Sequence, residues 1–353
     1  MKPAHRKALI LTIKLAVAGG LLWFALRKAH WSDYTEQVRD ASGRVRQVDR
    51  PGFRSAVGQA NPALLAGALA CFAVAVFIVA TRWWYLLRVL RIRIGLWEAI
   101  RLSFLGYFFS FLVPGVVSGD LIKAWYVFKH TDRKAAAMVS IFVDRVVGLL
   151  MFALLSAAVL VGIAAAGQWS EKFDLPAVAV AIVLGVLAAA SAAMLYPPTR
   201  RLFGRLLAFG PIKHHLEVVG KSVELYRRRF AALIGAAGFT FCSQAITIFG
   251  ILLLGRGLGL ASPWYEYFLY APLIYIIAAV PVSPGGIGVM EFCFVTFFAA
   301  GATAGSPGVS ASEATALALL ARLGPMICSL PGLIVALTGA KLPKTAEMEA
   351  ELE

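Results

Sequence analysis

The sequence contains few charged residues for its length. Asp, Glu, Lys and Arg make up 15% of the 353 residues, against about 25% in soluble globular proteins, while hydrophobic residues make up 60%. A helix that crosses a bilayer needs about 20 mostly apolar residues, and several runs of this length are present. This composition excludes an ordinary soluble enzyme and a disordered protein, and it predicts an all-α polytopic integral membrane protein.

Acidic residues are scarcer than basic ones. The chain has 19 Asp and Glu against 34 Lys and Arg, a net charge of +15. The basic residues lie between the apolar runs, where the positive-inside rule places them, and no basic face is interleaved with aromatic residues as in proteins that bind single-stranded nucleic acid. We therefore expect membrane lipids as partners, with the surplus charge against anionic headgroups, and no nucleic acid.

The residues that metal, redox and catalytic sites need are also few. All four cysteines lie in apolar runs without a Cys-x-x-Cys pair, and none of the five histidines lies in a predicted span. The sequence contains no Asp-x-Asp motif. These absences disfavour a disulfide framework, a metal site, a cofactor and a catalytic centre.

The apolar runs predict six full spans and two interrupted stretches. The predicted spans are residues 8–26, 62–81, 140–166, 176–196, 232–254 and 312–340. The stretches 97–128 and 264–300 are each broken by Pro and Gly. The flanking basic residues place both termini in the cytoplasm, and the basic N-terminus is interpreted as the start of a retained span, not of a cleaved signal peptide.

Two loops between the spans differ in charge. Residues 27–61 form a predicted extracytoplasmic loop, although they carry seven Lys and Arg against four acids. Residues 199–230 carry eight Lys and Arg, which is the strongest cytoplasmic signal in the chain. This basic loop is expected either to anchor the topology, which the positive-inside rule favours, or to gather anionic lipid along an apolar helix face.

The interrupted stretches predict an inverted repeat within one membrane domain, residues 1–353. Both flanks of the first stretch are basic and hence cytoplasmic, whereas the second begins and ends outside, so each is predicted to be a re-entrant hairpin. The alternative is that each stretch forms two short spans or one kinked span. The predicted divisions are a first half at 1–170, a second half at 171–341 and an acidic tail at 342–353. The residues expected to form the hairpins are Pro114, Gly115, Gly119, Pro284, Gly285, Gly286 and Gly288.

Each predicted hairpin carries an acidic residue, Asp120 in the first and Glu291 in the second. An acid at membrane depth costs about 2.5–3.5 kcal/mol on insertion scales, so it is a functional candidate by default. Asp120 is expected to pair with Lys123 or Arg145, and Glu291 is expected to pair with Arg322. These groups would bind a substrate, or they would only fix the hairpins as structural ion pairs. The predicted substrate-binding residues are Asp120, Lys123, Arg145, Glu291, Arg322, Ser110 and Ser283.

Two other acids are expected to serve only the start of a helix. Asp144 and Glu313 each stand near the beginning of a predicted span, where a carboxylate interacts favourably with the helix dipole.

Four segments of the chain match those of a known family. They are FFSFLVPGVVSGDLIKAW (108–125), VDRVVGLL (143–150), VPVSPGGIGVMEF (280–292) and ALLARLGP (318–325). In residues and in order they resemble the lysylphosphatidylglycerol synthase transmembrane-region family, which includes the flippase half of the bacterial multiple peptide resistance factor. The family usually has Asn, Gly and Arg where this chain has Ser110, Ser118 and Lys123, departures that bear on the headgroup more than on the fold.

The resemblance implies a lipid translocase in a bacterial cytoplasmic (inner) membrane. The headgroup of a phospholipid, or of another lipid phosphate, would cross through a polar cavity near the midplane, where Lys123, Arg145 and Arg322 would neutralise its phosphate. No soluble aminoacyl-transferase domain is evident in the sequence, so the lipid is expected to come from a separate synthase or from the bilayer itself. The alternatives are an integral-membrane lipid-modifying enzyme, which the missing catalytic motifs disfavour, and a non-transporting scaffold for an envelope lipid synthase.

Overall fold

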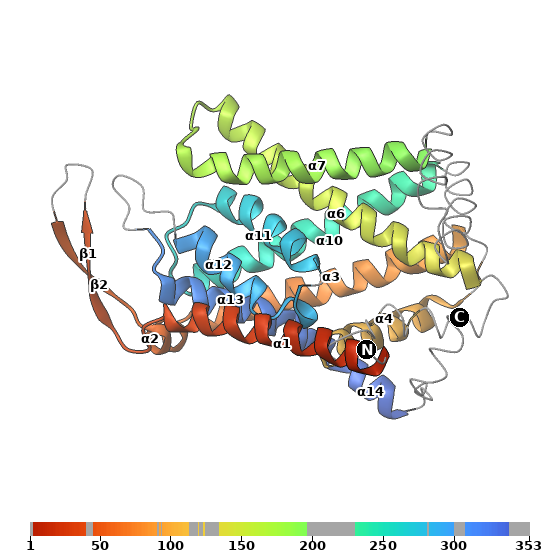
Figure 1. Ribbon diagram of the computed structural model, residues 1–353, viewed down its shortest axis with the longest axis horizontal. Coiled ribbons are helices and arrows are strands. Elements are labelled where there is room, and N and C mark those ends of the chain that lie inside the picture. Colours follow the sequence, from red (N-terminus) through yellow and green to blue (C-terminus); the bar gives the residue numbers. More distant parts are fainter. Residues whose placement is uncertain are drawn as a thin grey trace. The chain divides into compact units, whose positions relative to one another are not determined.

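A computed structural model describes residues 3–39, 45–89, 92, 94–112, 119, 123, 134–195, 230–280, 282–299 and 308–338. Helices dominate this part of the chain (Figure 1). The α-helices are α1 (Pro3–Arg27), α2 (Phe53–Gly58), α3 (Pro62–Val89), α4 (Leu96–Leu112), α6 (Lys134–Ala165), α7 (Asp174–Leu195), α10 (Phe230–Gly257), α11 (Trp264–Ala279), α12 (Val289–Ala299), α13 (Ala311–Ser329) and α14 (Pro331–Thr338). The 3-10 helices are η1 (Glu171–Phe173) and η2 (Pro284–Gly286).

Five helical segments are long and apolar enough to cross a membrane. They are Pro62–Val89, Asp144–Ala165, Glu171–Ala189, Ala231–Gly257 and Ala311–Leu337. Each coincides with a predicted span, and α1 covers the remaining prediction, residues 8–26. The polytopic membrane fold is therefore confirmed. The last span is broken, because α13 ends at Ser329 and α14 begins at Pro331, and proline supplies no backbone N–H to continue a helix.

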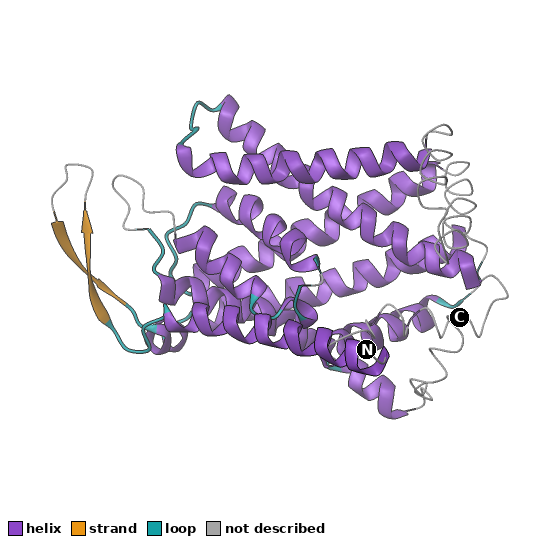
Figure 2. Ribbon diagram, viewed as in Figure 1, coloured by secondary structure: helices purple, strands orange, loops and turns teal. Residues whose placement is uncertain are grey.

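The predicted loop 27–61 contains a two-stranded sheet, which departs from an all-α chain (Figure 2). Strands β1 (Tyr34–Arg39) and β2 (Val45–Arg50) pair antiparallel, with Tyr34 opposite Arg50 and Arg39 opposite Val45. Their Tyr, Thr and Val residues favour a strand. The charge of the loop obscured this pattern in the sequence.

Asp33 fixes the junction between the β-hairpin and α2. Its carboxylate accepts a hydrogen bond from the Gly52 N–H at 2.8 Å. The pKa of Asp33 is lowered, chiefly because the Ser55 hydroxyl donates a hydrogen bond to the carboxylate and next because Gly52 does. Position 52 requires glycine, since a Cβ there would lie 2.3 Å from the carbonyl carbon of Ser32.

Contacts group the chain into two units, which are described separately below. The first unit comprises residues 1–73, 155–179 and 245–328, and the second comprises residues 74–154, 180–244 and 329–353. Each unit takes residues from both predicted halves of the chain, and the inverted repeat itself remains a prediction.

In the first unit, helices end and begin together on the side that carries the β-hairpin. The His30 N–H, just past α1, donates to Ser312 Oγ in the first turn of α13 at 2.9 Å. The Asn61 N–H, just before α3, donates to the Gly257 carbonyl at the end of α10, also at 2.9 Å. Helices α1 and α10 therefore end where α3 and α13 begin, as expected for successive spans of alternating direction.

The second interrupted stretch begins on this same side and returns to it. Glu266, in the first turn of α11, pairs with Lys172 in η1 at 2.9 Å. Helices α11 and α12 have 16 and 11 residues, about 24 and 17 Å, and both are shorter than the ~30 Å hydrocarbon core. The rings of Tyr267, near the start of α11, and Phe298, near the end of α12, are 5.2 Å apart. Because α12 runs back beside α11, the stretch is a helical hairpin rather than two full spans.

In the second unit, the chain that follows α4 folds back against α4. The Gly119 N–H donates to Ser110 Oγ at 3.1 Å, and Ser110 Oγ donates to the Gly106 carbonyl at 2.9 Å. A Cβ on Gly119 would lie 1.6 Å from that carbonyl oxygen, so only glycine fits here. Gly119 therefore lies back against α4, as the predicted first hairpin requires. The predicted turn residues Pro114 and Gly115 lie outside the described residues.

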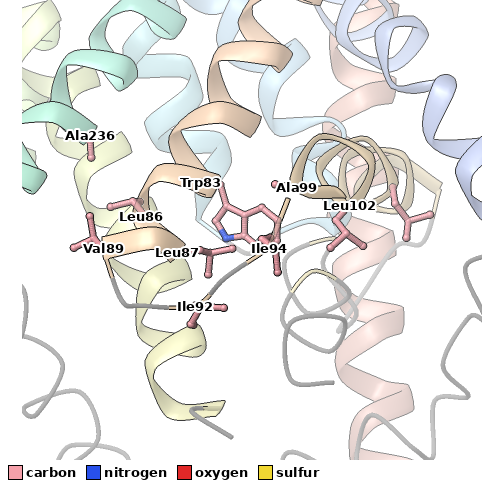
Figure 3. Packing of buried hydrophobic residues seen from close by; sticks show 10 residues of the cluster. Trp83, Leu86, Leu87, Val89, Ile92, Ile94, Ala99, Leu102 and Ala236 are labelled. Atoms are coloured by element: carbon pink, nitrogen blue, oxygen red, sulfur yellow. The ribbon is translucent and has the colours of Figure 1, made fainter. Parts of the chain in front are cut away.

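An apolar core supports α4 in the second unit (Figure 3). The core consists of Trp83, Leu86, Leu87, Val89, Ile92, Ile94, Ala99, Leu102, Leu105 and Ala236. Helix α14 packs on α4 as well, and a Cβ on Gly332 would lie 2.2 Å from the Phe104 carbonyl oxygen. Close packing through small residues is the usual way in which membrane helices associate.

Candidate functional site

The tip of the second hairpin, residues 282–288, lies between α11 and α12 and contains the short 3-10 helix η2 and three left-handed glycines. Gly285, Gly286 and Gly288 have φ values of 61°, 68° and 81°. Residues with a Cβ adopt this conformation at a cost of about 1–2 kcal/mol each, which explains the glycines of the sequence SPGGIG. Gly288 also contacts α1, where a Cβ would lie 2.3 Å from the Ala18 carbonyl oxygen. These three glycines are among the residues predicted to form the hairpin, and their φ values are those a tight turn requires.

Glu291 lies in the first turn of α12 and is 1% exposed. Its carboxylate oxygen Oε2 accepts a hydrogen bond from the Gly288 N–H at 2.7 Å, in the manner of the glutamate of a capping box. The same carboxylate forms a bidentate pair with Arg322 of α13. Arg322 Nε donates to Oε1, and Nη2 donates to Oε2 at 3.2 Å. The predicted pairing of Glu291 with Arg322 is therefore present.

Arg322 also holds the backbone of the tip. Its Nη1 donates to the Gly285 carbonyl at 3.1 Å, and its Nη2 donates to the Gly286 carbonyl at 2.9 Å. With the two bonds to Glu291, the guanidinium makes four hydrogen bonds, and a guanidinium has five N–H donors. We call this arrangement of Glu291, Arg322 and the two carbonyls the tip clamp.

Ser283 is the remaining polar side chain at the tip. It is 5% exposed, and its Oγ makes no hydrogen bond to any described residue. A buried hydroxyl without a partner costs free energy, so this atom stands out as a place for a ligand or water oxygen.

On the first hairpin, Lys123 lies against two aromatic rings. The side chain is 8% exposed, and Nζ lies 5.1 Å from the centre of the Tyr107 ring and 5.6 Å from that of Trp83. Cation–π contacts of this length stabilise an ammonium. Ser110, also predicted for this site, bridges Gly119 to Gly106 as described above. Asp120 lies outside the described residues, so its pairing with Lys123 or Arg145 stays a prediction.

Asp144 does not stand at the start of a helix, and that prediction is wrong. Helix α6 begins at Lys134, because the Ala-rich residues ahead of the predicted span also favour a helix. Asp144 instead pairs with Arg82 of α3, whose Nη2 donates to Oδ2 at 2.7 Å. Arg82 is 6% exposed, although it comes directly after the predicted span 62–81. Arg145, next to Asp144 in the chain, is exposed.

Glu313 does stand at a helix start, as predicted. Its carboxylate accepts a hydrogen bond from the Ser310 N–H at 2.7 Å, and its own N–H is bonded to Ser310 Oγ at 3.2 Å. This reciprocal arrangement is a capping box. Arg50 of β2 lies 3.8 Å from the Glu313 carboxylate and pairs with Glu36 at 3.0 Å. Part of the excess positive charge of the loop 27–61 is thus neutralised within the protein.

Within the described residues, no three or more His, Cys, Asp and Glu side chains are grouped so that they could hold a metal ion. The described parts of the two hairpins offer hydrogen-bond donors, the Lys123 ammonium and the ion-paired carboxylates of Glu291 and Glu266. Such groups can bind and position an anion or a polar headgroup.

Comparison with known proteins supports the resemblance seen in the sequence. A family model described as the lysylphosphatidylglycerol synthase TM region matches residues 11–332, which is nearly the whole chain. A search of curated proteins finds no match.

Proposed function

Because the chain belongs to the lysylphosphatidylglycerol synthase transmembrane-region family, we propose that it moves a phospholipid, or another lipid with a phosphate headgroup, between the leaflets of a bacterial cytoplasmic membrane. The observation that carries this proposal is the second hairpin. Its two half-helices are shorter than a bilayer, and a glycine segment held by the tip clamp joins them. Transporters use discontinuous helices of this kind at their substrate sites, and irregular backbone at membrane depth is tolerated only where it is buried in protein or lines a wet cavity.

The contacts suggest different roles for the charged residues. Arg322 already makes four hydrogen bonds, so we assign it to positioning the tip. The Ser283 hydroxyl would then be the tip group that meets the headgroup. On the first hairpin, Lys123 would supply the positive charge for the phosphate, with Ser110 beside it, and Asp120 would balance that charge.

The proposed orientation places both termini in the cytoplasm. Arg88, Arg101 and Arg145 of the second unit are exposed, and exposed arginines are concentrated on cytoplasmic faces. A separate synthase would make the lipid or the bilayer would supply it, and the protein would bind no nucleic acid.

The function is tested by headgroup transfer in proteoliposomes. The panel contains phosphatidylglycerol, lysyl-phosphatidylglycerol, phosphatidylethanolamine and a polyprenyl phosphate, and the variants are Asp120→Asn and Glu291→Gln. Glu266→Gln is the matched control, because Glu266 is likewise a buried, ion-paired acid in the first turn of a half-helix. We expect faster transfer of one lipid class than in protein-free vesicles, lost in the two hairpin variants and retained in the control.

Other outcomes would contradict parts of the proposal. Transfer that survives in both hairpin variants would show that the two acids are only structural. Absence of transfer for every lipid would refute the translocase on this panel and favour an enzyme or a scaffold for a lipid synthase.

A further inference from the structure

Arg82 forms the centre of an ionic cluster that the two hairpins do not include. Its Nη2 donates to Asp144 Oδ2 and its Nη1 donates to Thr240 Oγ1, each at 2.7 Å. The three residues come from α3, α6 and α10 of the second unit. Arg82 lies seven residues before the end of α3, and the other two lie ten residues after the starts of their helices. At 1.5 Å per residue they are about 10–15 Å from the helix ends. The apolar span of α6 begins at Asp144 itself, so the cluster is expected at the border of the apolar core of one leaflet.

The guanidinium of Arg82 has one N–H donor that the contacts above do not use. Arg82 Nε is buried and makes no hydrogen bond to any described residue, and the Arg82 side chain is only 8% exposed. A purely structural arginine at this depth is expected to have its buried donors paired, because an unpaired one costs free energy. The tip clamp provides the contrast, since Arg322 makes four hydrogen bonds.

The two partners of Arg82 differ in how firmly they are held. The Thr240 hydroxyl accepts from Arg82 and donates to the Ala236 carbonyl at 2.7 Å, so it fixes the guanidinium to α10. The Asp144 side chain is 20% exposed and is accessible from the surface of the protein. Arg82 would therefore keep its position if the Asp144 carboxylate moved away.

We propose that Arg82 is a binding site for the phosphate group of a lipid, and that the Asp144 carboxylate occupies this site in the absence of lipid. Guanidinium groups bind carboxylate and phosphate oxygens through the same paired N–H geometry, so a carboxylate can stand in for a phosphate. The phosphate would accept the Nη2 hydrogen bond in place of Asp144 and would also accept one from the buried Nε. This inference rests on the proposed function, because it gives the transported headgroup a site within one leaflet.

The proposal is tested with a variant that removes the ion pair without leaving a charge behind. Replacing a buried ion pair by apolar residues of similar volume is often neutral or stabilising, so Arg82→Met with Asp144→Leu is expected to fold. The matched control is Lys172→Met with Glu266→Leu, because that pair has nearly the same exposure, 20% and 6%, against 20% and 8% for Asp144 and Arg82. The single variant Asp144→Asn removes only the competing carboxylate.

Binding is measured as the rise in the thermal unfolding temperature of detergent-purified protein when ligand is added. The ligands are dioleoyl-phosphatidylglycerol, dioleoylglycerol, which lacks the phosphate, and inorganic phosphate. We expect phosphatidylglycerol alone of the two lipids to stabilise the native protein and the control. The double variant is expected to bind it roughly tenfold to a hundredfold more weakly. Asp144→Asn is expected to bind it more tightly than the native protein.

The other possible results also test the proposed Arg82 site. The site would be refuted if the double variant bound phosphatidylglycerol as tightly as the native protein does, or if dioleoylglycerol also stabilised the protein. Stabilisation by inorganic phosphate, lost in the double variant, would support the phosphate site and assign it to a soluble anion instead of a lipid. If the native protein binds phosphatidylglycerol through its phosphate but does not transfer it in proteoliposomes, the binding site is supported and the translocase is refuted. If the protein transfers the lipid and the double variant binds it as tightly as the native protein does, the translocase is supported and the Arg82 site is refuted.

Discussion

Removing the negative charge of the tip clamp is expected to loosen the second hairpin without unfolding the protein. Glu291→Gln keeps the size of the side chain and one carbonyl oxygen, which can still accept from Gly288 or from Arg322. It removes the ion pair and leaves a guanidinium that is 14% exposed without a counterion. Breaking a buried ion pair from one side costs about 3–5 kcal/mol. Because Arg322 retains its bonds to two carbonyls, we expect about 3 kcal/mol, the lower end of that range.

The loosening can be measured at Ser283, which the clamp keeps buried. Ser283→Cys is introduced into a protein whose natural cysteines have been replaced. Those cysteines are Cys71, Cys242, Cys293 and Cys328. If thiol labelling requires local opening of the tip, its rate follows the free energy of opening, and a loss of 3 kcal/mol raises the rate about a hundredfold.

Glu266→Gln, in the same cysteine background, is the control, because it removes a different buried acid of the same hairpin. Its labelling rate should stay within a few-fold of the parent. If Glu291→Gln labels no faster than the parent, the clamp does not hold the tip and our assignment of Arg322 is wrong.

Three further substitutions test other parts of the fold by thermal unfolding in detergent. Gly288→Ala places a Cβ on a left-handed residue, 2.3 Å from the backbone of α1, so it should destabilise the protein by more than about 1–2 kcal/mol. The control is Gly20→Ala, which should leave the stability unchanged or raise it, because a Cβ on Gly20 has no atom within 4 Å. Gly119→Ala would place a Cβ 1.6 Å from the Gly106 carbonyl oxygen and should separate the first hairpin from α4, and native stability in this variant would refute that contact. Asp33 has a lowered pKa, so the stability that its carboxylate contributes is complete above its ordinary pKa of about 3.9 and is lost as the pH falls through the lower pKa of the folded protein. Asp33→Asn should therefore be less stable than the native protein at pH 7. The difference in stability between the two proteins should shrink below the folded pKa.

Local patterns in the sequence predicted the second hairpin and the main contact of its tip. Pro and Gly at 284–288 determine an unwound segment, and Glu291 follows at capping distance. Once both flanks of a stretch lie on one side, Arg322 on the next helix is within reach of the glutamate. These features depend on the residue types of short segments and on which side of the bilayer their flanks lie, and both properties can be inferred from the sequence.

The Arg82–Asp144 pair could not be predicted in this way. Its formation depends on where α6 begins and on which faces of α3 and α6 meet, and these are properties of tertiary packing. The sequence did contain one signal, because α3 continues for seven residues past Arg82 to Val89, and six of the seven are apolar or aromatic, the exception being Arg88. A helix that continues so far past an arginine carries that arginine inward from the membrane surface.

The two ion-paired arginines show why charge at membrane depth does not by itself identify a binding site. Both Arg322 and Arg82 are paired with a carboxylate, and the insertion cost of such residues makes both functional candidates. They differ in the hydrogen bonds that remain to be made. Arg322 makes four hydrogen bonds to Glu291 and to the backbone of the tip, so a phosphate could bind to it only if the hydrogen bonds of the turn were broken. Arg82 has a buried donor, Nε, without a partner among the described residues, and its carboxylate, Asp144, is the more exposed member of the pair. A phosphate could therefore replace Asp144 while Thr240 holds the guanidinium in place, and this difference assigns positioning to one arginine and binding to the other.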